Sequence, residues 1–515
     1  MPLFVHNLEH FFTMNILTAF NLRLDISQPE VISIVGGGGK SSTMFQLANE
    51  ISASGKKIIT TTTTNIGPAQ TQNAPSVLRV ENDQLSMSEL AALLTQHNHC
   101  LLVSPEKEAT RGYKVSGISP QLVDTLARHS EELGVSAIVV EADGSHRLPI
   151  KAPAEYEPVV ADSTTMLVPV AGLDCIGTLI RNDYVHRPEH VRRLLGLNLS
   201  HDGRVDNSES ITLYQQTPRL SPNMVLRLLT SPDGGAKLLP NNARFMPIVT
   251  KVDTPIRLAA ARLIASKAVQ QGHSLFIASI VNTETVTEQR FIANAHRKIE
   301  AEQIGPLLER WAPAAIVVLA AGQSKRMGRS KQLEVVDGEA MVIRAVRTAL
   351  QSPTQHVIVV LGAYAEQIRE ALSSSFADSL SAVADQQLHL VHNGEWLTGQ
   401  ASSVRCAIDF LKTNSALQAA LFMPVDQPFI QPQLLRSLLR KWQKGARLVA
   451  PLLYGKPRGA PALFDRTLWS ELQQLSGDSG ARSVLQKYSV ELSTVPATAP
   501  QLFDIDSPSD LEKVS

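Results

Sequence analysis

The stretch IVVLAAGQSKRMGRSKQL, Ile316 to Leu333, decides the fold of the second half of this 515-residue chain. An apolar, β-branched run breaks at Ala320-Ala321-Gly322 into a loop rich in lysine and arginine. We predict a strand that delivers this loop to a polyanion, because Gly322 allows close backbone approach and the cations balance phosphate charge. Ala320, Ala321, Gly322 and Ser324 are predicted to bind the nucleotide, and Arg326 and Lys331 are predicted to be catalytic, since they offset the phosphate charge.

Downstream of this loop, helical and strand patterns alternate along the chain. The patterns predict helices near 340–351, 365–373 and 402–412, and strands at 356–361, 388–392 and 419–424. Strands separated by helices indicate a mostly parallel α/β sheet with right-handed crossovers. Ligands are therefore expected at the carboxyl ends of the strands.

Two aspartates are predicted to reach that edge and hold Mg2+. Asp426 ends an apolar strand in LFMPVDQPFI, and Asp506 lies in FDIDSPSDLE. A strand-end aspartate is more often a turn former, and Asp506 before Ser507-Pro508 could instead cap a helix. In this setting we favour a shared cation that bridges a triphosphate.

A small-residue loop, TGQASS, opens the helix predicted at 402–412. Gly399 and Ser402 are predicted to contact a phosphate or ribose, and a plain helix cap at Ser402 is the competing interpretation.

The first half begins its structured part with VISIVGGGGKSSTMFQLANEIS, Val31 to Ser52. Strand, glycine loop and helix in this order are typical of a phosphate-binding loop, where backbone N–H groups and the helix N-terminus surround the anion. Ile34 stands where the usual GxxxxGK[ST] pattern has glycine, so the loop is a glycine-rich variant, and a tight turn is the alternative. The predicted nucleotide-binding residues are Gly36, Gly37, Gly38, Gly39, Lys40, Ser41 and Ser42, with Ser41 also a Mg2+ ligand.

Other strand ends of this half carry polar residues. In VEADGSHRLPIKAP, Asp143 is predicted to hold Mg2+ opposite the glycine loop, although Asp143-Gly144 is also a common turn. The threonine run 60–64 is a supporting element only. Thr250-Lys251-Val252-Asp253 is similar to the base-recognition element of some nucleotide hydrolases, with threonine in place of the usual asparagine.

Three segments are predicted along the chain. Residues 1–29 form an N-terminal extension, 30–312 a phosphate-loop domain of the NTPase type and 313–515 a second α/β domain. Residues 285–311 are predicted to form the last helix of the first domain, and Pro313 marks the boundary.

Composition excludes several classes of protein. Lysine plus arginine and aspartate plus glutamate number 48 each, which argues against a nucleic-acid partner. Cys100, Cys175 and Cys406 are far apart, so a disulfide framework is not expected and a reducing compartment is favoured. No uninterrupted apolar window approaches the roughly 18 residues of a membrane span, and a cytoplasmic protein is predicted.

The motifs GGGGKSS, TTTTN, VEADGSHRLPIKAP, AGLD and His186-Arg187-Pro188-Glu189 resemble the selenium-dependent molybdenum hydroxylase accessory proteins, which are YqeC-like, over about 31–311. This resemblance implies a nucleotide-binding role in the maturation of molybdenum hydroxylases, with a hydroxylase apoenzyme as partner.

The motifs LAAGQSKRMGRSKQL, NGEWLTGQASSV, MPVDQPFI, RGAPALF, GDSGARSVL and FDIDSPSDLE resemble the MobA-like nucleotidyltransferases, closest to the molybdenum cofactor cytidylyltransferases, over about 314–511. The resemblance implies a Rossmann-like (GT-A-like) three-layer α/β/α domain that transfers CMP from CTP to molybdopterin and releases pyrophosphate. Ala321 makes the motif LAAG, as in the cytidylyl-transferring relatives, whereas guanylyl-transferring ones usually have LAGG. Ala460 stands where the family's GHPxLF segment often has histidine.

Two other functions compete with this prediction. One is a cofactor-insertion chaperone for a hydroxylase, switched by a nucleotide at the N-terminal loop. The other is a nucleotidyltransferase that acts on another phosphorylated acceptor, such as a sugar phosphate.

Overall fold

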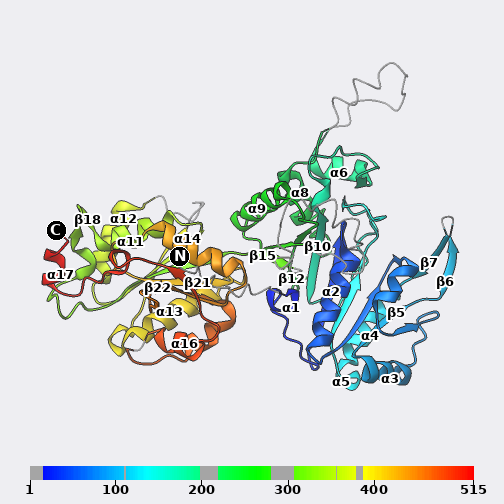
Figure 1. Ribbon diagram of the computed structural model, residues 1–515, viewed down its shortest axis with the longest axis horizontal. Helices are drawn as coiled ribbons and strands as arrows, with labels where there is room; N and C mark the ends of the chain where they lie inside the picture. The colour runs from blue at the N-terminus through cyan, green and yellow to red at the C-terminus, as the bar shows by residue number, and fades with distance from the viewer. Residues whose placement is uncertain are drawn as a thin grey trace, which may run out of the picture. The chain divides into compact units, whose positions relative to one another are not determined.

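The computed structural model describes residues 15–109, 112–197, 218–279, 307–354, 356–377, 387–478 and 480–514. The chain forms two compact units, one of residues up to Trp311, apart from Val269–His273, and one that begins at Ala312 (Figure 1). Residues 1–14 of the predicted extension and most of the predicted helix at 285–311 lie outside the described residues.

The N-terminal unit is built on one large sheet. Its neighbouring strands are parallel except β15, which runs antiparallel to β14. The order is β15 (Leu307–Trp311), β14 (Leu275–Ala278), β13 (Ile248–Thr250), β10 (Met166–Gly172), β1 (Glu30–Gly36), β8 (Val135–Glu141), β2 (Lys57–Thr62), β5 (His99–Val103) and β4 (Val77–Arg79), with β12 (Arg244–Phe245) beside β10.

Both faces of this sheet are covered by helices, which explains why its strands are almost continuously apolar. One face packs against α1 (Ile16–Ala19) and α2 (Lys40–Ala53), and the other against α3 (Met87–His97) and α4 (Pro120–Arg128). Near β13 and β14 a further core forms with α6 (Pro188–Leu195), α8 (Pro222–Thr230) and α9 (Pro255–Gln270). The remaining short elements are α5 (Ser130–Leu133), β3 (Asn65–Ile66), β6 (Glu106–Ala109), β7 (Gly112–Ser116), β9 (Ile150–Lys151) and β11 (Val185–His186).

Two segments of this unit differ from the sequence-based expectation. The prediction of a helix is wrong for its last residues, because Leu307–Trp311 form the edge strand β15, in which Trp311 pairs with Leu275. Ile16 and Phe20, within the predicted extension, are fully buried in the core, where Phe20 packs edge-on against Phe276.

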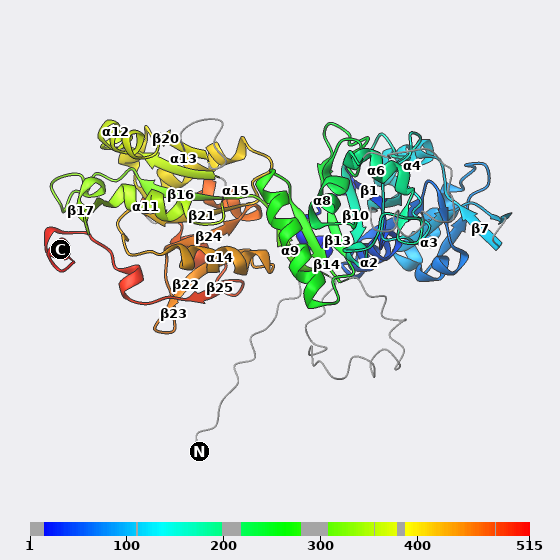
Figure 2. The same cartoon turned by 90° about the horizontal axis from the view of Figure 1, so that it is seen from above.

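The C-terminal unit has a second mixed sheet, seen from above in Figure 2. The first four strands are parallel, β24 runs antiparallel to both β21 and β22, and β25 is parallel to β22. The order is β20 (Gln387–His392), β19 (His356–Leu361), β16 (Ala314–Ala320), β21 (Ala419–Pro424), β24 (Ala462–Asp465), β22 (Leu448–Leu453) and β23 (Lys456–Pro457), with β25 (Ser493–Pro496) beside β22.

Alternate residues of the central strand β16 face opposite layers of this unit. Ile316 and Val318 pack in one core with α11 (Met341–Leu350), α12 (Ala365–Ser375) and α14 (Pro432–Gln443). Ala315 and Val317 pack in the other with α13 (Gln400–Lys412), α15 (Trp469–Gln473) and α16 (Arg482–Lys487). A three-layer arrangement results, and it confirms the predicted α/β class and the predicted alternation of helices and strands.

Among the described residues, no helix has both the length and the apolar character needed to cross a bilayer.

Candidate functional site

The basic loop of the C-terminal unit starts where β16 ends, at Ala320. Gln332 braces this loop from within: its amide nitrogen donates to the carbonyls of Ala320 (3.1 Å) and Gly322 (2.7 Å), and the residue is 1% exposed. Its amide oxygen accepts from the hydroxyl groups of Ser324 and Ser330. Sequence analysis missed Gln332, whose only signal was a polar residue at the end of the quoted motif.

The loop leaves open space where a phosphate is expected. A side chain built on Gly322 would meet no atom within 4 Å, so nothing in the described part of the chain accounts for a glycine there by packing. Ser324 has a left-handed backbone, with φ of 56°, and its carbonyl accepts from Met327 in a tight turn. Ala321 is 4% exposed and packs in the core behind the loop, so its methyl group does not line the open side.

The two predicted metal ligands, Asp426 and Asp506, meet at one lysine. The Lys331 ammonium lies 2.5 Å from Asp426 Oδ2 and 3.0 Å from Asp506 Oδ1. Arg326 donates to the other oxygen of Asp506 at 3.0 Å. Burial opposes the charge of Lys331, but the two carboxylates outweigh it and raise its pKa. The four residues therefore form one site, in which the cations now neutralise the carboxylates.

A divalent cation fits this acidic pair. Asp426 Oδ1 is buried and has no hydrogen-bond partner in the described structure, so one hard oxygen is available. No group of three or more histidine, cysteine or acidic side chains is placed to hold a metal among the described residues. Mg2+ commonly takes only one or two protein carboxylates and completes its shell with water and substrate phosphates. Two carboxylates beside a phosphate loop are a suitable donor set.

Asp504 adds a third carboxylate that the sequence analysis did not single out. It accepts a hydrogen bond from Gln427 at 2.9 Å. Burial of the carboxyl group raises the pKa of Asp504, and the charges of Asp426 and Asp506 raise it further.

Asp506 does not cap α17 (Pro508–Glu512), because Ser507 and Asp510 form the capping box. The carboxylate of Asp506 is therefore not needed at the start of this helix.

The second predicted loop of this unit is a buried polar cluster. Asn393 donates to the hydroxyls of Ser402 (2.8 Å) and Ser403 (3.0 Å), and Ser402 donates to the Gly399 carbonyl. Ser402 is not the helix cap, because α13 starts at Gln400 with Gly399 before it. A side chain on Gly399 would lie 2.5 Å from the Gly477 carbonyl, so close packing requires this glycine.

In the N-terminal unit, the predicted glycine loop joins β1 to α2 and packs tightly on its neighbours. A side chain on Gly36 would lie 2.4 Å from the Val170 carbonyl, and one on Gly38 would lie 2.3 Å from the Gly172 nitrogen. Both residues also have left-handed φ values, 95° and 72°. Packing thus accounts for these glycines, while Gly38 to Ser42 still line a large cavity.

Lys40 at the start of α2 lies between two acidic side chains. Its ammonium donates to the Gly36 carbonyl (2.7 Å) and lies 3.3 Å from Asp143 and 3.7 Å from Glu141. Glu141 also accepts from the Ser41 hydroxyl at 2.6 Å. Burial raises the pKa of Glu141 more than Lys40 and Ser41 lower it.

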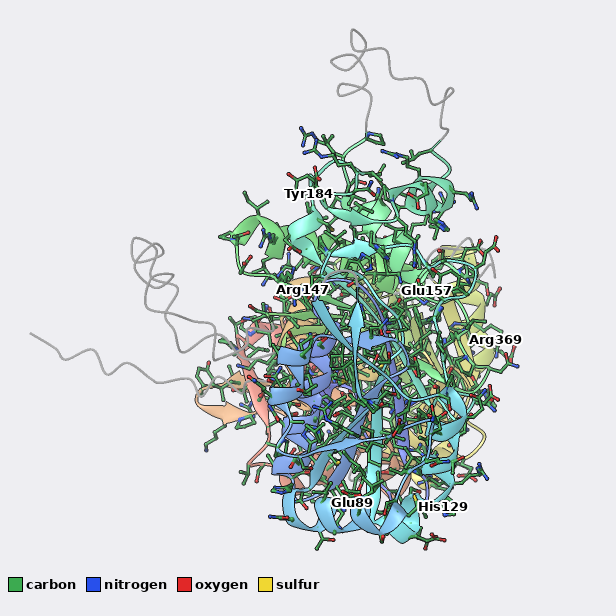
Figure 3. The ribbon with its side chains drawn as sticks, turned by 90° about the vertical axis from the view of Figure 1, so that its right-hand side faces the viewer. Glu89, His129, Arg147, Glu157, Tyr184 and Arg369 are labelled. Atoms are coloured by element: carbon green, nitrogen blue, oxygen red, sulfur yellow. The ribbon has the colours of Figure 1, made fainter. Side chains whose placement is uncertain are left out.

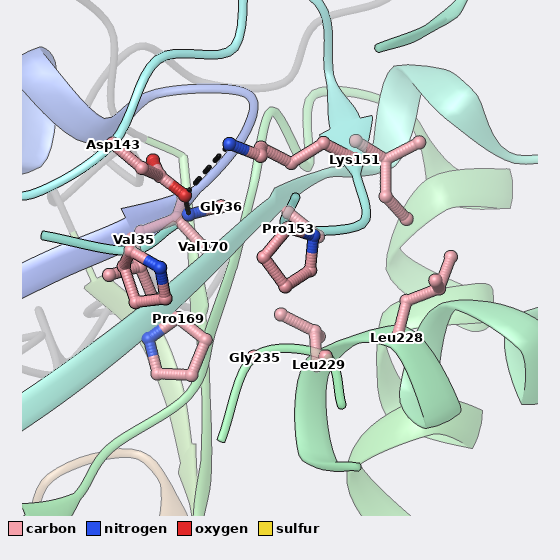
Figure 4. A pocket seen from close by; sticks show the side chains of 14 residues that line it. Val35, Gly36, Asp143, Lys151, Pro153, Pro169, Val170, Leu228, Leu229 and Gly235 are labelled. Atoms are coloured by element: carbon pink, nitrogen blue, oxygen red, sulfur yellow. Dashed lines mark hydrogen bonds and ion pairs between the residues drawn. The ribbon is translucent and has the colours of Figure 1, made fainter. Parts of the chain in front are cut away.

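Asp143 is held away from that cavity. It is 2% exposed, accepts from the Gly36 N–H at 2.9 Å and lies 3.1 Å from Lys151. Figure 4 draws both contacts as dashed lines. The wall of the large cavity contains Glu141 but not Asp143. Glu141, next to Ser41, therefore lines the cavity, while Asp143, whose Oδ1 is buried without a hydrogen-bond partner in the described structure, stays a predicted Mg2+ ligand.

The ion pairs continue from Lys151 to Glu157 and then to Arg187; Arg187 lies in a quoted motif but was assigned no role from the sequence. Lys151 lies 2.5 Å from Glu157, and Arg187 pairs with the same carboxylate. Although burial raises the pKa of Glu157, Arg187 and Lys151 lower it to about 2. Lys40 and Arg187 are thus the two ends of one charged network, whose members in order are Lys40, Asp143, Lys151, Glu157 and Arg187.

The predicted base-recognition element does not present its aspartate to the cavity. Asp253 pairs with Arg257 one turn along α9, at 2.5 Å, and the Thr250 hydroxyl donates to the Gly38 carbonyl. Lys251 lines the cavity but pairs with Asp174 at 2.7 Å.

Family models match both halves of the chain. The model described as YqeC protein matches residues 32–189, and that described as MobA-like NTP transferase domain matches 316–492. The chain therefore carries a YqeC-family domain and, after it, a MobA-like nucleotidyltransferase domain.

Similar individual proteins agree with these two matches. Uncharacterized protein YqeC of Escherichia coli (strain K12) is 34% identical over 170 residues, 33% of this chain and 62% of that protein. Purine catabolism protein PucB of Bacillus subtilis (strain 168) is 28% identical over 203 residues, 38% of this chain and 94% of that protein. The chain thus spans less than two thirds of the YqeC relative.

Among solved structures, Rv0371c of Mycobacterium tuberculosis H37Rv in complex with manganese is 22% identical, with a TM-score of 0.32. The match covers 39% of this chain and 97% of that one.

Proposed function

We propose that the C-terminal unit transfers CMP from CTP to the terminal phosphate of molybdopterin and releases pyrophosphate. The observation that carries this proposal is the meeting of Lys331, Asp426 and Asp506 at the carboxyl edge of the sheet, beside the open Gly322 loop. It accords with the MobA-like domain match.

The chemistry is an in-line attack by a phosphate oxygen of the acceptor on the α-phosphorus of CTP. The attacking oxygen is already ionised, so no protein nucleophile or strong base is needed, and positioning with charge stabilisation carries the rate. The loop from Ala320 to Ser324 holds the triphosphate, and Lys331 and Arg326 balance its negative charge. Mg2+ held by Asp426 and Asp506 would supply Lewis-acid stabilisation of the pyrophosphate leaving group.

CTP is the proposed nucleotide because of Ala321. Its side chain is buried behind the loop, so it would act by setting the position of the loop backbone and not by touching the base. A panel of nucleoside triphosphates tests this: wild type should prefer CTP, and Ala321→Gly should lower the ratio of kcat/KM for CTP over GTP. An unchanged ratio would remove this argument for CTP.

Molybdopterin as the acceptor rests on the resemblance to the cytidylyltransferases, with Ala460 as a departure from the family pattern. The test is pyrophosphate release by the full chain with CTP and purified molybdopterin. Release should require the acceptor and should fall below detection in Asp426→Ala with the fold intact by circular dichroism. Turnover with a sugar phosphate in place of molybdopterin would identify another phosphorylated acceptor.

For the N-terminal unit we propose a second nucleotide site at Gly38 to Ser42, with a Mg2+ ligand at Ser41, serving the maturation of a molybdenum hydroxylase. The cavity beside these residues favours this role. Nucleotide-dependent binding of a hydroxylase apoenzyme without CMP transfer would favour the chaperone hypothesis instead. The cytoplasm is the proposed location, since Cys100, Cys175 and Cys406 are free thiols.

A further inference from the structure

A cavity of about 740 Å3 lies in the N-terminal unit at the start of α2. This volume suits a ligand of nucleotide size and far exceeds a single phosphate ion. The glycine loop forms only one side of the cavity. The other sides come from 64–70, from 144–147 after β8, and from Tyr156, Glu157, His186 and Arg187.

The loop side offers backbone donors to a polyanion. In the described structure no protein acceptor is recorded for the N–H groups of Gly38 and Gly39 or for those of Lys40, Ser41 and Ser42 at the start of α2; the first helical bond is from Thr43 to the Gly39 carbonyl. Lys40 also lines the cavity here, with its ammonium on the Gly36 carbonyl and between Asp143 and Glu141. Phosphate groups would therefore bind on this side.

The facing side presents a pair of imidazole rings. His146 and His186 lie with ring centroids 4.5 Å apart and planes inclined by 41°. Burial, together with the positive charges of Arg187 and Lys151, lowers the pKa of His186 to about 4. His186 is therefore uncharged near neutral pH, and the pair offers an aromatic surface on which a flat ring can stack.

Arg147 is a further cation on this side of the cavity, and it is labelled in Figure 3. It has no ion pair or hydrogen bond among the described residues, whereas Arg187 is engaged with Glu157 and with the Tyr156 hydroxyl at 3.0 Å. His146 and Arg147 both have left-handed backbones, with φ of 52° and 64°. An exposed arginine without a counter-ion suits the negative charge of a phosphorylated ligand.

We propose that this cavity binds a nucleotide whose phosphates lie on the start of α2 and whose base stacks on the His146–His186 pair. This inference rests on the proposed second nucleotide site and deepens it, because it moves base recognition away from Thr250–Asp253. Asp253 is paired with Arg257 and is absent from the cavity wall.

The test uses hydrogen exchange of the full chain, followed by mass spectrometry in the peptide that contains Gly38 to Ser42. ATP, GTP, CTP and inorganic tripolyphosphate are titrated separately, each with Mg2+, and the concentration for half-maximal protection is measured. This readout reports on the N-terminal site alone. A base in the stack should make the best nucleotide bind about tenfold or more tightly than tripolyphosphate.

Three variants separate the two parts of the site. His146→Ala with His186→Ala should weaken that nucleotide by about ten- to a hundredfold and leave tripolyphosphate unchanged. His146→Phe with His186→Phe should retain nucleotide affinity, because a flat aromatic face remains. His190→Ala, on α6 outside the cavity wall, is the control and should change neither ligand. If the double alanine variant does not fold, His146→Ala alone, at an exposed residue, serves instead.

Two results would overturn the proposal. Equal weakening of nucleotide and tripolyphosphate in the alanine variants would show that the histidines only position the loop, as would equal affinities in wild type. If neither the nucleotides nor tripolyphosphate protect the peptide, the second nucleotide site itself is overturned, and Lys40→Ala then has no effect either. This outcome differs from equal weakening of nucleotide and tripolyphosphate, which overturns only the role of the histidines.

Discussion

Replacement of Lys331 by methionine should tighten metal binding and slow catalysis. The ammonium of Lys331 lies 2.5 Å from Asp426 and 3.0 Å from Asp506, so it occupies the space between the carboxylates that would hold a divalent cation. A metal that arrives without nucleotide must displace it. Lys331→Met keeps an unbranched side chain that is shorter only by the terminal nitrogen, and it removes that competing charge.

The size of the effect follows from burial. A charge pair near a protein surface interacts by about 4 kcal/mol at 4 Å before solvation costs, and fully exposed pairs retain about 0–1 kcal/mol. The side chains of Lys331 and Asp426 are 14% and 21% exposed, whereas that of Asp506 is 44% exposed, so most of the effect comes from Asp426. We expect a net change of about 1–3 kcal/mol, which is about five- to a hundredfold tighter binding of Mn2+ in the absence of nucleotide.

Two measurements on the full chain check this prediction. Mn2+ binding is followed by electron paramagnetic resonance or calorimetry, and turnover by pyrophosphate release, where the loss of a transition-state cation should cost about a hundredfold or more. Arg326→Met, which loses only an exposed contact with Asp506, should change Mn2+ affinity by less than about fivefold. Lys325→Met, at an exposed residue of the same loop, is the neutral control. Unchanged or weaker Mn2+ binding in Lys331→Met would refute the competition between the lysine and the metal.

Three further outcomes are expected. Gly38→Ala should destabilise the N-terminal unit by roughly 2–4 kcal/mol in urea unfolding, because a methyl group would lie 2.3 Å from the Gly172 nitrogen at a left-handed φ. Gly144→Ala, with no atom within 4 Å of the added carbon, should stay within about 0.5 kcal/mol, and similar losses in both would contradict the packing argument. Burial lowers the pKa of His99 to about 4, below its ordinary value of 6.5. The contribution of the neutral imidazole to the free energy of unfolding should therefore be fully present above pH 6.5 and should be lost as the pH drops towards 4. At pH 5 the loss should be about 2 kcal/mol. His99→Asn should lose this part of the pH dependence between pH 7 and pH 5, and an unchanged slope would be inconsistent with a neutral buried imidazole. Asn393→Ala should lower the thermal stability of the C-terminal unit by about 1–3 kcal/mol, because the Ser402 and Ser403 hydroxyls lose their buried partner. Mn2+ affinity should stay unchanged. A selective loss of CTP binding at unchanged stability would instead indicate a direct role of Asn393 in the nucleotide site.

Much of the fold was predictable because its strands are uninterrupted apolar runs. The strands predicted at 356–361 and 419–424 are β19 and β21, with the predicted bounds. A parallel strand with helices on both faces must be apolar on both faces, so its sequence is a continuous apolar run. Strand β15 was missed because charged residues are mixed with apolar ones throughout 285–311, a pattern that was interpreted as one helix. Glu309 has a tertiary partner, Arg262 on α9, and within β15 it accepts a hydrogen bond from the Trp311 indole.

The candidate sites were predictable where a strand end supplies the residue. Asp426, just after β21, and Asp506, in the loop before α17, are 80 positions apart in the chain and were predicted to share one cation; the structure brings them together at Lys331, while their role as metal ligands stays a prediction. Gln332 and Asp504 gave no such signal, because each is a single polar residue whose role depends on a loop conformation. The pairing of His146 with His186 likewise depends on two loops that only the folded chain brings together.

The edge strand β15 also bears on how the chain is made. It pairs with β14 through Leu275 to Ala278, and only Ala312 and Pro313 separate it from β16 of the next unit. On the ribosome the N-terminal sheet therefore completes its edge with the last residues synthesised before the transferase domain begins. A nascent chain released before Leu307 would leave the β14 edge open to pairing with other chains, and separate expression of the two halves should divide the gene after Trp311 and not earlier.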